Sequence, residues 1–353
     1  MAKIKEFLKR KDIVFSGKRY GIDALGAMAQ GLFCSLLVGT ILGALGGQLK
    51  LSFLTDAGNF AKAVSGAAMA VAIGYALKAP ALVLFSLAAV GHAANGLGGA
   101  GGPLAVLVIA VVAAEFGKAV SKETKVDILV TPLVTILVGV GLAALIAEPI
   151  GTAASKVGNF IKWATDLQPL LMGIIVSVTV GIALTLPISS AAICAALGLT
   201  GLAGGAAVAG CCAQMVGFAV MSFRENRWGG LVAQGIGTSM LQMPNIVKNP
   251  RIWIPPTLAS AINGPLATCV FQLQMNGAAI NSGMGTCGLC GQIGVYTGWL
   301  QDMASGAKAA ITPMDWIGLV LISFVLPAIL TWLFVLPLRK WGWIKENDLK
   351  LDL

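Results

Sequence analysis

Neutral hydrogen-bonding side chains are the residues of this sequence best suited to chemistry. They gather in and near two glycine-rich interruptions of apolar segments, Gly91–Pro103 and Asn276–Gln292. The predicted solute-binding residues are His92, Asn95, Glu148, Asn263, Asn281, Ser282 and Gln292. Amides, a hydroxyl and one imidazole with little charge around them suit a neutral polyhydroxyl solute better than an ion.

Each of these residues also has a purely structural interpretation. His92 is the only histidine; it could bind a solute or relay a proton, or it could end a helix with its nitrogens satisfied by backbone carbonyls. Glu148 could bind solute or merely lie at the membrane interface. Asn263, together with Gln272 and Gln274, could equally join neighbouring helices, as amides commonly do in membranes. The sequence leaves these alternatives open.

Signs of catalysis and of cofactor binding are weak. Cys287 and Cys290 have the spacing of a redox or zinc pair, but one such pair without a nearby histidine is poor evidence for either. The glycine pattern in 96–101 lacks the strand and crossover helix of a dinucleotide site. No catalytic triad, phosphate loop or paired carboxylates occur. We therefore predict no metal, no cofactor and no self-contained catalytic site.

Composition identifies the solvent in which the chain folds. Hydrophobic residues make up 57% and charged residues 11% of 353 positions, whereas a soluble domain carries roughly 25% charged residues. At roughly 20 apolar residues per crossing, the stretch 22–338 has room for about ten transmembrane helices. The 45 glycines favour close packing of such helices. The sequence thus predicts an all-α polytopic membrane protein, with Glu115 and Lys118 as an i,i+3 ion pair at one helix end.

Positive charge is concentrated at the two ends of the chain. Residues 1–20 carry seven basic and two acidic side chains, and the tail from Arg339 is basic as well. Beside a bilayer, such tails indicate cytoplasmic anchors rather than contacts with nucleic acid. The apolar run Ala24–Leu45 is longer than the core of a cleavable signal peptide. We expect a multi-pass protein of the bacterial cell membrane with both termini cytoplasmic, and cysteines that are reduced and buried.

Five short motifs occur twice in the same order, which predicts an internal duplication. Small residues four apart, as in the first motif, form a close-packing stripe on one helix face. The pairs are Gly31-x3-Ser35-x3-Gly39 with Gly173-x3-Ser177-x3-Gly181; Gly66-Ala67-Ala68-Met69 with Gly205-Ala206-Ala207-Val208; Lys78-Ala79-Pro80 with Lys248-Asn249-Pro250; Gly96-x-Gly98-x-x-Gly101 with Gly283-x-Gly285-x-x-Gly288; and Asp127 22 residues before Pro149 with Asp315 22 residues before Pro337.

The duplication divides the chain into four parts: a basic N-terminal segment 1–20, a first membrane repeat 21–155, a second membrane repeat 165–338 and a C-terminal tail 339–353. Expected spans of the first repeat are 22–46, 61–78, 80–95, 103–120 and 128–148, and the second repeat has extra segments near 187–203 and 223–247. Five helices per repeat would place the second copy upside down, as in secondary transporters. Four basic residues would then lie outside the cell unless they belong to a re-entrant or interfacial element: Arg224, Arg227, Lys248 and Arg251.

Three stretches carry a resemblance to a known family: Asp12–Phe33, Gly91–Gly96 and Met240–Asn245. Through them the chain resembles the membrane-spanning enzyme IIC components of bacterial phosphotransferase systems, in particular the stand-alone branch labelled sugar transporter subunit or putative toxin-gene regulator. The resemblance implies a homodimeric permease that presents sugar to a separate cytoplasmic IIB-type phospho-carrier. His92 and Glu148 are the matches to the histidine and glutamate that bind sugar in that family, although neither stands in an alignable motif.

The leading prediction is a permease for a small neutral solute, most simply a sugar. The chain ends shortly after its last span, so a partner protein must supply phosphate for a coupled transfer. A membrane receptor or regulator of gene expression without transport is the alternative that the family resemblance suggests. A membrane oxidoreductase is a third reading, and it rests only on Cys287 and Cys290.

Overall fold

The structure is a computed structural model that describes residues 2–351. In this range the chain forms helices joined by turns and no β-strand. A single isolated β-bridge pairs Gly201 with Met275. Two compact units can be distinguished. Unit 1 comprises the described residues up to Gly39 together with Asp56–Ala153, and unit 2 comprises Thr40–Thr55 together with the described residues from Ala154 onward. The predicted all-helical fold is therefore confirmed.

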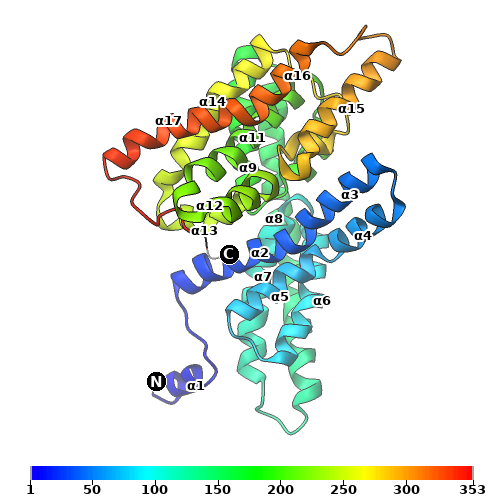
Figure 1. The fold of residues 1–353 in the computed structure, drawn as a ribbon. Helices are drawn as coiled ribbons and strands as arrows, with labels where there is room; N and C mark the ends of the chain where they lie inside the picture. Colours follow the sequence, from blue (N-terminus) through cyan, green and yellow to red (C-terminus); the bar gives the residue numbers. More distant parts are fainter. Residues whose placement is uncertain (1, 352–353) are drawn as a thin grey trace. The chain divides into compact units, whose positions relative to one another are not determined.

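Unit 1 is built from helices of the first half of the chain (Figure 1). Within it α5 packs against α2 and α6, and α6 packs against α7. The elements are α1 (Ala2–Arg10), α2 (Ala24–Leu32), α4 (Ser52–Ala63, shared with unit 2), α5 (Ser65–Ala76), α6 (Ala81–Gly98), α7 (Gly102–Val120) and α8 (Asp127–Thr165, which continues into unit 2).

The small-residue stripe predicted on the first membrane helix is confirmed as a close helix contact. A Cβ atom on Gly31 would lie 2.6 Å from the carbonyl oxygen of Ala68 on α5. One on Gly39 would lie 2.7 Å from the carbonyl oxygen of Gly58 on α4. Real Cβ atoms do not approach backbone so closely, so only glycine lets these helices meet at this distance.

Lys118 is the most deeply buried cation of unit 1, with 1% of its side chain exposed. Its ammonium group lies 3.0 Å from a carboxylate oxygen of Glu115, which confirms the predicted i,i+3 pair, and donates to the carbonyl oxygens of Asp12 at 2.7 Å and Leu77 at 3.0 Å. Arg19 also donates to Leu77 and to the Asp12 carboxylate. The hydrogen bond from Arg19 to the Asp12 carboxylate lowers the pKa of Asp12 below its usual 3.8.

Replacing Lys118 by methionine should therefore destabilise unit 1. The change leaves the Glu115 carboxylate buried without a cation and the carbonyl oxygen of Asp12 without its donor, whereas Leu77 keeps its bond from Arg19, at a cost of about 2 kcal/mol. A thermal-unfolding measurement in detergent would show it as a lower melting temperature. The double variant Lys118→Met, Glu115→Leu should recover much of the loss, because it removes the uncompensated charge. Equal instability of the single and double variants would contradict this account.

Unit 2 is organised around α11 (Gly201–Met221), which is buried along nearly its whole length. α11 packs against α9, α14 and α17, and α9 also contacts α14 (Figure 1). The other helices are α3 (Val38–Leu49, which enters from unit 1), α9 (Pro169–Thr185), α10 (Ser190–Leu197), α12 (Phe223–Val232), α13 (Met243–Lys248), α14 (Ile254–Pro265), α15 (Cys290–Ala304), α16 (Pro313–Val320) and α17 (Leu326–Lys340).

The second small-residue stripe is likewise confirmed as a contact. A Cβ atom on Gly173 would lie 2.9 Å from the backbone nitrogen of Pro265 on α14, and one on Gly181 would lie 2.8 Å from the carbonyl oxygen of Gly210 on α11. Ser177, between the two glycines, donates to the carbonyl oxygen of Ser260 on α14 at 2.7 Å. The stripe thus holds α9, α11 and α14 together.

Both predicted glycine-rich breaks are present, with different lengths. α6 continues through Gly91 to Gly98, and only a tight turn at Gly99–Gly101 interrupts the helical path before α7. Gly99 has a φ of +50°, which glycine adopts without strain. The helix thus runs three residues beyond the expected span 80–95, and the interruption is confined to the last part of Gly91–Pro103. The second break is longer, because 271–289 consists of short 3-10 turns and irregular backbone.

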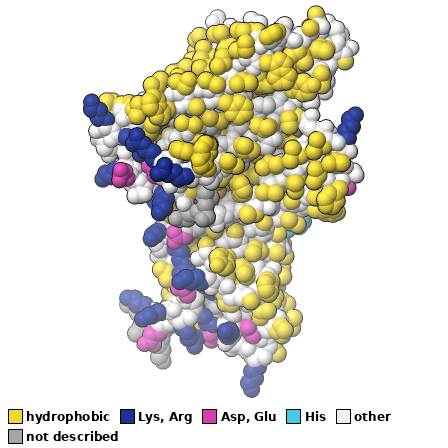
Figure 2. Space-filling view, viewed as in Figure 1, with side chains coloured by type: hydrophobic (Ala, Val, Ile, Leu, Met, Phe, Trp, Pro, Cys, Tyr) yellow, Lys and Arg dark blue, Asp and Glu magenta, His cyan; other side chains and the backbone are white. Residues whose placement is uncertain are grey.

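Five helical segments of the described residues are long and apolar enough to cross a membrane, and α5 and α9 are shorter apolar helices. One of the five, Ala81–Val120, combines α6 and α7 across the tight turn. Broad hydrophobic surface is exposed on the face of unit 2 seen in Figure 2, and α17 contributes Ile329, Trp332 and Leu333 to the exposed apolar residues. The helices of unit 2 thus suit a lipid surrounding, while the arrangement of ten helices as two inverted repeats stays a prediction.

The basic residues of the second half lie on short helices beside the C-terminal end of α17. α12 carries Glu225, which forms an ion pair of 2.8 Å with Arg339. Arg251, in the 3-10 turn Pro250–Trp253, lies 5.1 Å from the ring of Trp343. The segment 223–251 therefore lies on the same side of unit 2 as the C-terminal tail. This position supports an interfacial element. It does not support a location outside the cell, which a simple inversion of the second repeat would require.

Candidate functional site

A polar pocket of about 320 Å³ lies in unit 2, where the second break meets α15 and α16. The volume is within the range of small-molecule sites. Its lining combines amides, carboxylates, one ammonium group and an indole ring. The lining residues are Phe271, Gln272, Leu273, Gln274, Asn276, Trp299, Asp302, Ala307, Lys308, Asp315 and Gly318.

Asn276 holds one wall of the pocket in place. Its side-chain oxygen accepts from the backbone nitrogen of Gly201, the first residue of α11, at 3.1 Å. Its side-chain nitrogen donates to Asp302 on α15 at 2.8 Å and to Gln274 at 3.2 Å. Three segments that are far apart in the sequence thus converge on one amide. The oxygen of Asp302 that accepts this bond leaves the other oxygen of the carboxylate for a further donor.

Lys308 and Asp315 form the adjoining part of the lining, since the backbone nitrogen of Lys308 donates to the carbonyl oxygen of Asp302 at 3.0 Å. The ammonium group lies 2.8 Å from Asp315 and 6.0 Å from the ring centre of Trp299. Asp315 also accepts from the backbone nitrogen of Thr312 at 2.7 Å, while its own backbone nitrogen donates to the Thr312 hydroxyl, so it closes a capping box at the start of α16. Trp299 is 3% exposed and packs edge-on against Trp316.

This combination of groups can recognise a polyhydroxyl solute. Carboxylate and amide oxygens accept hydrogen bonds from hydroxyl groups, and amide nitrogens and the ammonium group donate to them. Trp299 lies almost fully buried behind the Lys308 ammonium group, so it contributes apolar closure of the pocket rather than a free ring face. The two carboxylates are not balanced by Lys308 alone, so an anionic solute would be disfavoured.

An apolar cluster closes the pocket toward the interior of unit 2. Leu273 and Trp299 belong to both the pocket lining and this cluster. The buried members are Val208, Ala209, Cys212, Ala267, Leu273, Met275, Val295, Trp299, Leu319 and Ile322. A hydrated solute cannot cross such a cluster unless its side chains move.

Below the cluster, Gln214 of α11 centres a buried polar network that the sequence did not single out. Its side-chain oxygen accepts from Trp253 at 2.9 Å and from Thr185 at 3.3 Å, and its nitrogen lies 3.4 Å from the hydroxyls of Thr257 and Ser260. All of these groups are neutral. Gln214 is two residues beyond the cluster member Cys212 on the same helix, so polar and apolar layers follow each other along α11.

Two predicted site residues lie next to each other against α11 and the π-helical turn Leu321–Val325. Asn263 donates to the carbonyl oxygens of Ala209 and Ile322, at 2.9 and 2.8 Å. Gln292 donates to Ser323 at 2.9 Å. Each amide keeps a buried side-chain oxygen without a hydrogen-bond partner. They thus join helices, as the structural interpretation expects, and each still offers an acceptor.

The other predicted site residues do not form one cluster, because they are divided between the two units. Ser282 is buried and donates to the carbonyl oxygen of Ala279, while Asn281 is half-buried against Gly294 of α15. In unit 1, His92 and Glu148 are exposed on α6 and α8. Asn95 is half-buried between Gly66 of α5 and Gly102 of α7. Their role in solute binding stays a prediction.

Five of the seven cysteines are buried as expected, including Cys287 and Cys290. The expectation is wrong for Cys34 and Cys269, which are exposed. Among residues 2–351, no group of three or more His, Cys, Asp or Glu side chains could hold a metal ion.

The sequence signal for the pocket was partial. Gln272 and Gln274 were recognised as hydrogen-bonding capacity, and Asn276 opens the predicted second break. Asp302 and Lys308 were missed because charged residues in the last turn of a helix and in the connection after it are ordinarily solvated. Asp302 and Lys308 follow Trp299 by three and nine residues, and this short spacing was the one sequence signal that could have indicated them.

Comparison with known proteins bears on the whole chain. A family model described as phosphotransferase system, EIIC matches residues 22–351. Neither the curated proteins nor the solved structures gave a match. The matched range includes the pocket, the described residues of unit 2, unit 1 from Ile22 onward, and the five membrane-length helices apart from residues 19–21 of the first. The chain therefore belongs to the EIIC family of the phosphotransferase system, the multi-pass membrane subunits of that system.

Proposed function

We propose that this chain is the sugar-translocating subunit of a phosphotransferase system and that the pocket of unit 2 binds the sugar. The observation that carries the proposal is the convergence of Asn276, Asp302, Lys308 and Trp299 on one cavity of about 320 Å³. The carboxylates and amides suit hydroxyl groups, and the EIIC family supports a sugar as the solute class. Asn263 and Gln292, with their unpartnered oxygens, are proposed to meet the sugar farther along α11.

The pocket and the C-terminus mark opposite ends of unit 2. α11 begins at Gly201 beside Asn276 and ends at Met221, whose carbonyl oxygen accepts from Arg339 at 3.0 Å. At 1.5 Å per residue its 21 residues extend about 30 Å, the thickness of the hydrocarbon core. Arg224, Arg227, Arg251 and Arg339 make the C-terminal end basic, which favours the cytoplasm for it and the outer side for the pocket.

The remaining elements of the proposal follow from the family. A separate cytoplasmic IIB-type carrier would supply phosphate to the sugar, and both termini would be cytoplasmic. The homodimer and the sugar-binding roles of His92, Asn95 and Glu148 in unit 1, with those of Asn281 and Ser282 in unit 2, are part of the same proposal. Binding of membrane lipid is expected from the exposed apolar helix surfaces.

A ligand-stability screen tests the proposed function. Purified protein in detergent would be heated with hexoses, pentoses, disaccharides, polyols, nucleosides and organic acids in turn. We expect a neutral sugar to raise the melting temperature and the organic acids to leave it unchanged. The sugar should then accumulate in membrane vesicles that contain the protein and its phospho-carrier. Stabilisation by organic acids alone would overturn the proposal.

A further inference from the structure

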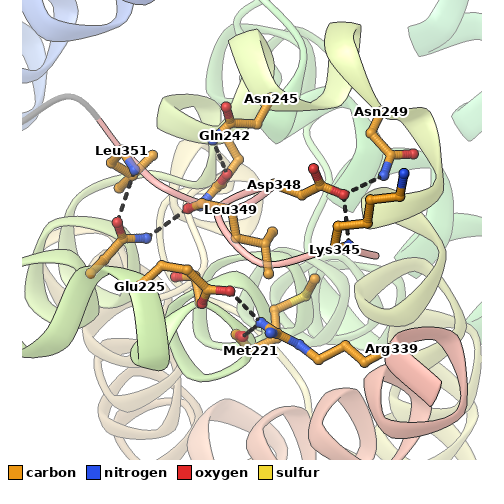
Figure 3. Close-up of polar contacts among 12 residues, drawn as sticks. Met221, Glu225, Gln242, Asn245, Asn249, Arg339, Lys345, Asp348, Leu349 and Leu351 are labelled. Carbon is orange, nitrogen blue, oxygen red and sulfur yellow. Dashed lines mark hydrogen bonds and ion pairs between the residues drawn. The ribbon is translucent and has the colours of Figure 1, made fainter. Parts of the chain in front are cut away.

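The C-terminal residues Ile344–Leu351, here called the strap, fold back from α17 onto a groove lined by amide side chains (Figure 3). Asn226 of α12 binds the strap twice: its nitrogen donates to the carbonyl oxygen of Leu349 at 2.7 Å, and its oxygen accepts from the backbone nitrogen of Leu351 at 2.8 Å. Gln242 donates to the same Leu349 oxygen at 3.0 Å. The groove thus holds the strap by its main chain.

Two asparagines of the following segment complete the groove. Asn245 of α13 donates to the carbonyl oxygen of Lys350 at 2.8 Å. Asn249 donates to the Asp348 carboxylate at 2.8 Å and to the carbonyl oxygen of Trp343 at 2.9 Å (Figure 3). The bond of Asn249 to Trp343 is exposed and its bond to Asp348 is partly buried, so water can replace the strap there more easily than at the buried bond of Gln242 to Leu349.

Apolar anchors fix the register of the strap. Ile344, Leu349 and Leu351 are 2%, 0% and 8% exposed, whereas Lys345 and Glu346 between the anchors are exposed. Amide side chains that bind the main chain, combined with pockets for three side chains, form a peptide-binding groove. The present occupant is the chain's own C-terminus.

A chain of buried amides leads inward from the strap. Asn245 donates to Gln242, Gln242 donates to Gln234, and Gln234 donates to the hydroxyl of Ser222, each at 2.9 Å. Gln234, Gln242 and Ser222 are fully buried. Buried amides are costly without partners, so this chain needs either the strap or another polar occupant at its outer end.

The polar network around Gln214 lies at the other end of one 3-10 turn. Gln242 ends a 3-10 turn that begins at Ser239, and the hydroxyl of Ser239 lies 2.8 Å from that of Thr185. Thr185 in turn lies 3.3 Å from the Gln214 oxygen. Two neutral polar networks, one at the strap and one at the middle of α11, are thus joined by this 3-10 turn, with the buried residues Met240 and Leu241 between them, and together they mark the polar route.

We propose that the strap is a releasable latch that closes this polar route at the C-terminal end of unit 2, so that sugar leaves only when the strap detaches. The inference rests on the proposed function, because it assigns a gate to the same solute path. Gly342, at a φ of +71° with open space around it, provides a hinge between α17 and the strap. The ion pair of Arg339 with Glu225 holds the end of α17 while the strap moves.

Thiol labelling tests the latch without any sugar. Ser239→Cys places a reactive group on the route, and mass spectrometry of the peptide that contains it separates its labelling from that of the native cysteines. With the strap in place, a membrane-impermeant maleimide should label this position slowly. Adding Asn226→Ala removes two strap contacts and should raise the rate at least about tenfold. Adding Glu346→Ala, an exposed strap residue, should leave the rate unchanged.

A second variant separates release from misfolding. In a Ser239→Cys chain that ends at Trp343, labelling should be fast, and a synthetic peptide of residues 344–353 should slow it again. Labelling that is equally fast with and without Asn226→Ala, or that the peptide leaves unchanged, would overturn the latch. Strap-dependent labelling in a protein that binds no sugar would instead overturn the proposed function and leave the latch standing.

Discussion

Asp302→Asn is expected to weaken sugar binding by roughly 50-fold, since a hydrogen bond to a charged group contributes about 1.5 to 3 kcal/mol. The carboxylate of Asp302 faces the pocket beside Trp299 and accepts from Asn276. An asparagine has the same shape and can still accept from Asn276, so the wall should stay in place while the charge is lost. Titration of the sugar against intrinsic tryptophan fluorescence measures the change.

Asp166→Asn is the matched control for this prediction. Asp166 belongs to the same unit, is exposed and does not line the pocket. Its replacement should leave the dissociation constant unchanged. Equal affinity of wild-type protein and the Asp302→Asn variant would remove the pocket from the sugar site and direct attention back to His92, Asn95 and Glu148.

Gly210→Ala is expected to prevent unit 2 from assembling. A Cβ atom at this position would lie 1.9 Å from the carbonyl oxygen of Ser177 on α9 and 2.6 Å from its Cα atom. Backbone atoms cannot turn aside as a flexible side chain can, so α9 and α11 would have to separate. Ser177 donates to α14, so the loss would extend to that helix. We expect a cost of at least about 3 kcal/mol.

Size-exclusion chromatography of detergent extracts measures the outcome as loss of the monodisperse peak. Gly158→Ala in α8 is the control, because it is also a buried helical glycine of unit 2 and a Cβ atom there would lie no closer than 3.4 Å to its neighbours. That variant should match or exceed wild-type stability, since alanine favours helix over glycine. A Gly210→Ala protein with the wild-type melting temperature would show that the α9–α11 contact is looser than described.

The fold was predictable where one residue type has one physical use. Glycine and serine four apart in a membrane helix can only be a packing face, and both stripes pack as expected. Asp127 begins α8, which contains Pro149, and Asp315 lies near the start of the helical segment Pro313–Lys340, which contains Pro337 in α17; each proline follows 22 residues later. The extent of the first break was not predictable, because α6 stays helical where Gly91 packs against Gly66 of α5 and Gly98 against Ala105 of α7, contacts that no local pattern reveals.

The site was predictable only in outline, because its parts come from segments far apart in the chain. The sequence indicates polar residues near the second break, whose role in solute binding stays a prediction, but nothing local joins Asn276 to Gly201 or to Asp302. Gln214 escaped notice because one glutamine among small apolar residues gives no pattern. Its importance comes from Trp253, Thr185 and Ser260, which the fold brings to it.

The burial of α11 has a consequence for biogenesis. A helix made largely of glycine, alanine and cysteine with Gln214 at its centre is a poor lipid-facing segment when it leaves the ribosome. Its amide and glycine faces need α9, which is already synthesised, and α14, which begins at Ile254, 33 residues after Met221. The insertion machinery must therefore keep α11 shielded from the bilayer until α14 has emerged. Membrane integration of this half of the chain is then a single concerted event rather than the release of one helix after another.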